Sequence, residues 1–159
     1  MTGEDNHHNG QTVVIPSEEA VFWLDSRGYW RNSGGQFRKK KIIDYFHAAI
    51  ARDANGYHLY QQKGEGFEKV YFPFEDTALF VFEVVFLKDG ITLVLNTGRR
   101  LKLTPRSLYS KNDCLYLMDK DELIKFSERA LMQIAPLLEE RENGFGINCG
   151  GQWHPIAER

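Results

Sequence analysis

Two segments of the chain, residues 50–59 and 138–147, follow the same pattern. In each, charged residues precede an Asn-Gly pair, and an aromatic residue then opens a stretch of alternating apolar and polar residues. Superimposing Asn55 on Asn143 gives an offset of 88 residues. We interpret each segment as the end of an amphipathic helix, an Asn-Gly stop and the start of a strand, because Asn and Gly tolerate the left-handed conformation of a helix exit. The repeat predicts two related halves with a ligand cleft between them.

The length and charge of the chain exclude several classes of protein. A chain of 159 residues fits one domain or two small subdomains that share a core. A formal net charge of −2 and a pI near 6.2 argue against duplex nucleic acid or an anionic membrane as partners. The longest apolar run, residues 78–87, is shorter than the roughly 20 residues of a membrane-spanning helix. The first nine residues lack the apolar core of a signal peptide, so we expect a cytoplasmic protein.

The sequence carries no pattern of metal or cofactor ligands. Cys114 and Cys149 are the only cysteines, and their flanks offer no second pair of ligands at the spacing of a zinc site. The glycine-rich stretch 144–150 begins a predicted strand instead of following one, which excludes a dinucleotide-binding loop. We therefore expect two reduced thiols, no metal and no cofactor.

The first half of the chain predicts a tail followed by a small α+β subdomain. Residues 1–16 are predicted to be a flexible tail, and residues 17–77 the N-terminal subdomain. Within that subdomain, residues 21–30 alternate around a turn as an aromatic-rich hairpin. Apolar residues at helical spacing predict a helix over residues 38–52, and two short strands follow it.

The second half, residues 78–159, predicts a C-terminal subdomain of the same kind. An Asp-Gly pair at 89–90 predicts a hairpin, and residues 106–113 are predicted to be a polar loop. A long helix is expected from about residue 121 to residue 141, with a kink caused by Pro136. The predicted fold is α+β, with two related subdomains that each pack antiparallel strands on one helix.

The sequence resembles a bacterial family, the domain of unknown function 1285. The resemblance extends from about Phe22 to Ile156, and it is carried by the order and spacing of four stretches. These stretches are Arg27-Gly28-Tyr29-Trp30, the segment 37–57, Phe74-Glu75-Asp76 and the closing segment 150–156.

The resemblance implies a duplicated α+β fold whose second half is similar to a pleckstrin-homology domain. It also implies a ligand site between the halves and a role in signal transduction. The family has no established activity. The chain departs from the family pattern at Lys39, where the family tends to have arginine, and at Thr77-Ala78, where it tends to have proline. Lysine keeps the positive charge but loses the bidentate geometry of arginine toward phosphate or carboxylate.

Two cations and two carboxylates are the first candidates for ligand contacts. Lys39 lies among four consecutive cations at the start of a predicted helix, where exposed amides and positive charge suit an anion. Arg129 lies beside the apolar face of the long predicted helix. Glu75 and Asp76 would accept hydrogen bonds, although adjacent strand residues point to opposite faces.

Four further residues complete the predicted ligand site. Asn96 and Thr97 would provide neutral polar contacts, and Trp30 and Trp153 are the aromatic residues expected on an exposed face. The first hypothesis is a non-enzymatic module that binds a small polar or anionic ligand, or a peptide, between its two halves. No residue is assigned a catalytic role in this hypothesis.

Two alternatives stay open at the level of the sequence. The first is a hydrolase that uses Glu75 or Asp76 with His58, which requires a carboxyl or imidazole of perturbed pKa in a closed pocket. The second is a protein-interaction adaptor, in which the pleckstrin-homology-like half docks a partner or forms a homo-oligomer through its sheet edge. A flat apolar patch without a pocket would favour this alternative.

Overall fold

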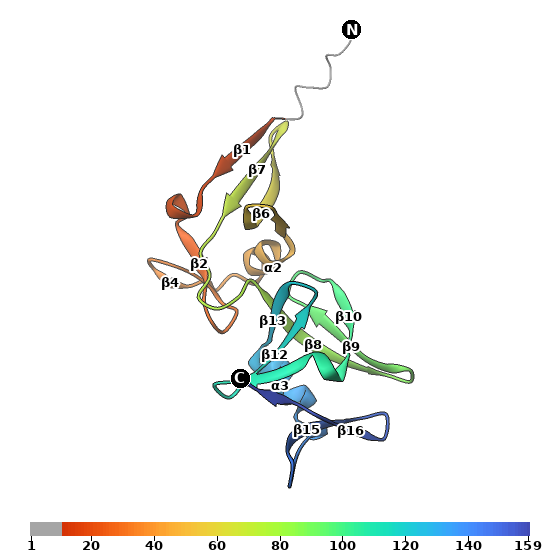
Figure 1. Ribbon diagram of the computed structural model, residues 1–159. Coiled ribbons are helices and arrows are strands. Elements are labelled where there is room, and N and C mark those ends of the chain that lie inside the picture. The colour runs from red at the N-terminus through yellow and green to blue at the C-terminus, as the bar shows by residue number, and fades with distance from the viewer. Residues whose placement is uncertain (1–10) are drawn as a thin grey trace. The chain divides into compact units, whose positions relative to one another are not determined.

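The computed structural model describes residues 11–159, which divide into two compact units on either side of the Ala78–Leu79 bond (Figure 1). In the described residues each unit is rich in β-strands and contains one short α-helix, so the predicted α+β class is confirmed. No helix in this part of the chain is long and apolar enough to cross a membrane.

Two sheets and one helix form the described part of the N-terminal unit. The elements are β1 (Thr12–Ile15), β2 (Phe22–Leu24), β3 (Trp30–Asn32), β4 (Gly35–Gln36), α2 (Lys40–Ala48), β5 (Ile50–Asp53), β6 (Gly56–Lys63) and β7 (Gly66–Tyr71). One sheet has the strand order β1-β7-β6-β5, and the other has the order β2-β3-β4. β1 pairs with β7 in parallel, whereas the other pairs in these two sheets are antiparallel.

The predicted tail ends earlier than expected. Residues 1–10 of that prediction lie outside the described residues, but Thr12–Ile15 form β1, which pairs with β7 from Phe67 to Val70. The tail prediction is therefore wrong for these four residues. The available strand signal was the short β-branched run Val13-Val14-Ile15, which ends at a proline.

The two Asn-Gly pairs close β-hairpins, so the prediction of helix stops is wrong. α2 ends at Ala48, and residues 50–53 form β5, which returns as β6 after the two-residue turn Ala54–Asn55. Gly56 follows this turn with φ +117°, a conformation that glycine adopts more readily than residues with a Cβ. Gly144 has φ +123° at the corresponding place in the second hairpin. The charged residues before each Asn-Gly pair are therefore strand residues.

Trp30 lies at the centre of the N-terminal core. It is 1% exposed, and its ring makes edge contacts with Phe22, Phe46 and Phe72 at centroid distances of 4.9–5.8 Å. Such T-shaped contacts are a preferred geometry for aromatic pairs. The predicted aromatic hairpin therefore forms, and it supplies the core against which α2 packs through Phe46.

The C-terminal unit has two sheets and a second short helix. Its first elements are β8 (Leu79–Leu87), β9 (Gly90–Leu95), β10 (Arg100–Lys102), β11 (Leu108–Lys111), β12 (Cys114–Asp119) and β13 (Glu122–Phe126). These are followed by α3 (Glu128–Ile134), β14 (Leu138–Arg141), β15 (Gly144–Cys149), β16 (Gln152–Pro155) and β17 (Ala157–Glu158). The strand orders are β10-β9-β8-β13-β12-β11-β17 and β14-β15-β16. The β8–β13 and β11–β17 pairs are parallel, so this unit is not purely antiparallel as predicted.

The long helix predicted over residues 121–141 is replaced by a strand, a short helix and another strand. The turn at Lys120 has φ +58° and joins β12 to β13, so the acidic residues around it do not cap a helix. The true N-cap of α3 is Ser127, whose hydroxyl accepts a hydrogen bond from the backbone N–H of Ala130 at 3.2 Å. α3 ends at Ile134, and Pro136 lies in the 3₁₀ turn that follows instead of kinking a continuous helix.

The predicted polar loop over residues 106–113 is also corrected. Leu108–Lys111 form β11, which pairs with β12 on one side and β17 on the other. Leu108 and Tyr109 are both buried in this strand, so the segment contributes to the core. The Asp-Gly hairpin is confirmed, because β8 and β9 pair up to Leu87 and Gly90.

Candidate functional site

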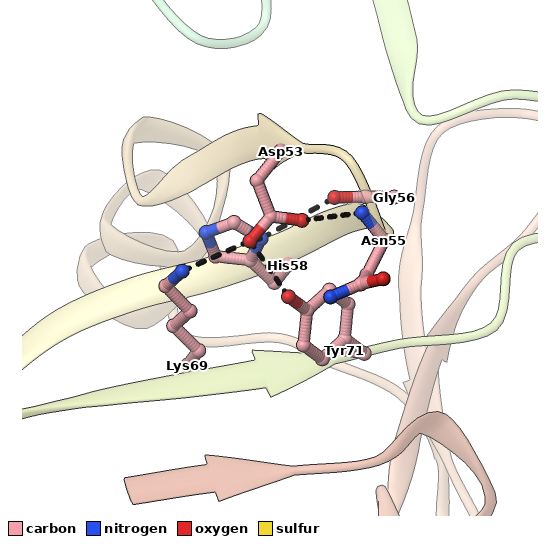
Figure 2. Close-up of polar contacts among 6 residues, drawn as sticks. All are labelled: Asp53, Asn55, Gly56, His58, Lys69 and Tyr71. Atoms are coloured by element: carbon pink, nitrogen blue, oxygen red, sulfur yellow. Dashed lines mark hydrogen bonds and ion pairs between the residues drawn. The ribbon is translucent and has the colours of Figure 1, made fainter. Parts of the chain in front are cut away.

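Polar contacts converge on the carboxylate of Asp53 at one end of the first sheet (Figure 2). Its Oδ2 accepts hydrogen bonds from the Lys69 ammonium at 2.9 Å and from the Tyr71 hydroxyl at 2.7 Å. Its Oδ1 accepts a third from the backbone N–H of Asn55 at 2.9 Å, which fixes the turn after β5. We call Asp53, His58, Lys69 and Tyr71 the Asp53 cluster.

The Asp53 cluster lies on the face of the sheet that is turned away from α2. His58 on β6 is paired directly with Tyr71 on β7, and successive side chains of a strand point to opposite faces. Gln61, three residues after His58, therefore points the other way, where its Oε1 accepts a hydrogen bond from the Tyr45 hydroxyl of α2 at 3.0 Å. The helix and the cluster thus occupy opposite faces.

The ionisation of Asp53, Lys69 and Tyr71 does not suit acid–base chemistry. Hydrogen bonds from Lys69 and Tyr71 hold the pKa of Asp53 well below its usual range. The same carboxylate raises the pKa of Lys69 and the pKa of Tyr71, in each case mainly through its hydrogen bond. An efficient general base or acid has a pKa close to the working pH. The pKa values of these three groups are shifted away from pH 7. Their hydrogen bonds therefore serve to hold the strands of the sheet together.

His58 is buried, with 3% of its surface exposed, and it lies beside Asp53. Its Nδ1 is 3.3 Å from the carbonyl oxygen of Gly56 and 3.9 Å from Oδ2 of Asp53. Glu75 instead accepts a hydrogen bond from the backbone N–H of Ser26 at 3.0 Å. No hydrogen bond or ion pair joins His58 to Glu75 or to Asp76 within residues 11–159, so neither proposed hydrolase pair is assembled by such a contact.

A groove with a volume of about 930 Å³ lies within the C-terminal unit. The central sheet contributes Leu108 and Leu115, which are both buried. α3 contributes Leu131, the β14–β15 hairpin contributes Phe145, and the segment between β16 and β17 contributes Ile156. This volume falls near the upper end of the range for small-molecule sites. We call this feature the C-terminal groove.

Charged and polar side chains surround the apolar lining of the C-terminal groove. They are Arg106, Ser110, Asp113, Asn143, Glu140, His154 and Glu158. Three of these residues are carboxylates and one is an arginine, so the fixed charge of the lining is negative when the histidine is neutral. Within residues 11–159 none of the four charged side chains forms an ion pair with another residue. Their charges are therefore available to a ligand.

The predicted ligand residues of the N-terminal unit have different environments. Trp30 is buried and its indole N–H donates to Nδ1 of His47 at 3.3 Å, so the prediction that it is exposed is wrong. Lys39 is exposed at the N-cap of α2. Glu75 is exposed and Asp76 is half-buried, which agrees with opposite orientations of neighbouring residues.

The predicted ligand residues of the C-terminal unit do not line its groove. Asn96 is buried, and its Oδ1 accepts a hydrogen bond from the backbone N–H of Phe80 at 3.0 Å. The Thr97 hydroxyl accepts a backbone N–H two residues further on at 3.3 Å. Arg129 is exposed on α3, and Trp153 is half-buried on β16. Asn96 and Thr97 therefore hold local structure.

Sequence reasoning missed the residues of the groove because it treated residues 106–113 as a loop. The available signal for a strand was the adjacent pair Leu108-Tyr109, because aromatic residues are enriched in strands. In the part of the chain that the structure describes, no group of three or more His, Cys, Asp or Glu side chains is placed to hold a metal ion.

The arrangement of the elements is similar to that of two solved structures. A DUF1285 family protein from Silicibacter pomeroyi DSS-3 aligns with a TM-score of 0.61 and 14% sequence identity, over 99% of this chain and 89% of that one. A DUF1285 family protein from Shewanella baltica OS155 aligns with a TM-score of 0.51 and 15% identity, over 76% of this chain and 94% of that one. Neither a family model nor a curated protein matches the sequence. The chain therefore has a DUF1285-type fold.

Proposed function

We propose that this protein is a non-enzymatic ligand-binding module, and that the C-terminal groove holds its ligand. The ligand is a small polar or anionic molecule or a peptide, and the module takes part in signal transduction. The groove carries the proposal, because it combines an apolar lining with charged side chains from four different segments that form no ion pair within residues 11–159. Such a combination is the usual composition of a ligand site.

Two features of the described residues support a module without catalysis. In the Asp53 cluster, the pKa of Asp53 is lowered and the pKa values of its two partners are raised, which suits fixed ionic structure. On β15, burial raises the pKa of the Cys149 thiol, which lowers the fraction of reactive thiolate. The hydrolase hypothesis therefore receives no support from these groups.

We also propose that each unit contains one copy of a duplicated motif. α2 begins at Lys40 and α3 at Glu128, which is the same offset of 88 residues as the Asn-Gly pairs. The strands β5 and β14 also begin 88 residues apart, at Ile50 and Leu138. A helix followed by a hairpin therefore occurs in both units, with the two copies 88 residues apart. The pleckstrin-homology-like character of the second half, and a ligand site between the halves, stay predictions from the resemblance.

The ligand proposal is tested by screening a library of polar metabolites and short peptides against ¹⁵N-labelled full-length protein. We expect the backbone amide shifts of binding compounds to cluster on the groove strands β11, β14 and β17. Ala157 and Ala135 line the groove and are exposed, so Ala157→Trp and Ala135→Trp fill it without disturbing the core. Each is expected to weaken binding at least ten-fold.

Ala48→Trp is the matched control, because Ala48 is an exposed alanine on α2 and does not line the groove. It should leave binding unchanged. If binding compounds shift amides elsewhere, or if both groove-filling variants bind as tightly as the wild type, the C-terminal groove is not the ligand site.

A further inference from the structure

We infer that the occupant of the C-terminal groove is an extended peptide segment that alternates basic and apolar side chains. This inference rests on the proposed function, and it narrows the ligand to one chemical class. It follows from the charge of the lining, from the strands that border the groove and from its dimensions.

The charge of the lining selects a cationic ligand. Asp113, Glu140 and Glu158 come from a turn, from β14 and from β17, and all three are exposed. Arg106 is the one arginine or lysine among the described residues that line the groove. Carboxylates that lack an ion-pair partner in residues 11–159 attract Lys or Arg side chains and repel an anion. An anionic ligand would have Arg106 as its main favourable contact against three repulsive charges.

The strands that border the groove suit an extended backbone. β14 is the outermost strand of the β14-β15-β16 sheet, and β17 is the outermost strand of the seven-stranded sheet. Leu138 and Glu140 of β14, and Ala157 and Glu158 of β17, all line the groove. In the described part of the chain each of these strands has a neighbouring strand on one side. An outermost strand offers backbone donors and acceptors to an added peptide strand.

The apolar lining suits every second side chain of such a peptide. Leu115, Leu131 and Phe145 lie in the groove with its carboxylates, and side chains of an extended chain alternate between two directions. One set of alternating side chains can therefore contact the apolar residues while the other set meets the carboxylates. A volume of about 930 Å³ accommodates several residues of a peptide.

The experiment measures fluorescence anisotropy of labelled, end-capped hexapeptides with the full-length protein. The peptides have the repeat Lys-Val, Ser-Val or Glu-Val, and a fourth is the Lys-Val peptide methylated on alternate backbone nitrogens. We expect the Lys-Val peptide to bind at least ten-fold more tightly than the Glu-Val peptide. The methylated peptide should bind at least five-fold more weakly, because it loses backbone donors.

Matched variants locate the effect in the groove. The double variant Glu140→Gln with Glu158→Gln should weaken Lys-Val binding at least five-fold, and high salt should weaken it in the wild type. Glu83→Gln is the control, because Glu83 is an exposed glutamate of the same unit that does not line the groove. It should bind the Lys-Val peptide as the wild type does.

Three results would overturn the inference. They are equal or tighter binding of the Glu-Val peptide, no binding of the Lys-Val peptide, and an unchanged affinity in the Glu140 and Glu158 double variant. The proposed function fails separately. If small polar compounds still shift the amides of the groove while no basic peptide binds, the groove is a ligand site of another chemical class and only the inference is wrong.

Discussion

His47 makes the stability of the N-terminal unit sensitive to mild acid. It lies in the last turn of α2, it is 3% exposed, and its Nδ1 accepts the indole N–H of Trp30 at 3.3 Å. Burial lowers the pKa of His47 from 6.5 to about 4, and the negative charge of Asp44 opposes part of this shift. The native state therefore holds this imidazole neutral at a pH where the unfolded chain protonates it.

The sign and size of the effect follow from this shift. Below pH 6.5 the unfolded state binds a proton that the native state does not, so the free energy of unfolding falls as the pH falls. The linkage relation gives a loss of about 2 kcal/mol by pH 5 and about 3 kcal/mol by pH 4. Stability from the neutral imidazole is fully present above pH 6.5.

Equilibrium unfolding in urea, followed by tryptophan fluorescence and circular dichroism at several pH values from 7 to 4.5, measures this loss. The variant His47→Gln keeps an amide oxygen that accepts the Trp30 N–H but does not titrate, so its stability should fall by about 2 kcal/mol less than that of the wild type between pH 7 and pH 5. Ala48→Gln is the control, because Ala48 is an exposed residue of the same helix and the substitution removes no titrating group, so the slope should stay that of the wild type. Equal slopes for His47→Gln and the wild type would refute this reasoning.

Three further substitutions test other contacts, each by urea unfolding. Asp53→Asn should lower the free energy of unfolding at pH 7 and have less effect at pH 3. A carboxylate with a lowered pKa stabilises the native state above its unfolded pKa and loses that effect in acid. Asp89→Asn is the control, because Asp89 lies in an exposed turn, and it should leave stability unchanged. Gly146→Ala places a methyl group 2.5 Å from a backbone oxygen of β16 and should cost about 1–3 kcal/mol, unlike Gly34→Ala, whose nearest contact is a side chain at 3.3 Å. Ser127→Ala removes the N-cap of α3 and should cost about 1 kcal/mol, and replacement by Asp should restore most of it. An unchanged midpoint for Asp53→Asn at pH 7, for Gly146→Ala or for Ser127→Ala would contradict the corresponding contact.

Local signals in the sequence predicted two hairpins correctly, although the two Asn-Gly hairpins were interpreted as helix ends. The Asp-Gly pair at 89–90 and the aromatic hairpin ending at Trp30 both form as expected, because turn chemistry and alternation act over a few residues. The helix expected over 121–141 failed because residues 122–126 form a central strand between β12 and β8. A strand buried on both faces shows no alternation, so a short apolar run cannot be distinguished from a helix by its period alone.

The candidate sites were less accessible to prediction than the fold. Asp53, Lys69 and Tyr71 are separated by up to 18 residues, and they meet only because the β5–β6–β7 register places them at neighbouring positions. That register depended on reading residues 50–53 as a strand, whereas their spacing was compatible with the end of a helix. Predicting the C-terminal groove likewise required recognising β11 as a strand. The polar residues at 110–113 made this segment similar to a loop.

The two hairpins that share the 88-residue spacing are stabilised by different chemistry. Asp53, the last residue of β5, binds an ammonium and a phenol, whereas Arg141, at the same place in β14, lies 5.1 Å from the ring centre of Trp153. His58 fills the sheet face in the first hairpin, while Gly146 leaves room for the Trp153 ring in the second. A similar backbone thus carries a closed polar cluster in one unit and borders an open groove in the other. A cluster whose groups satisfy one another has little capacity for a ligand. Binding is therefore expected at the C-terminal groove, whose charged side chains form no ion pair within residues 11–159.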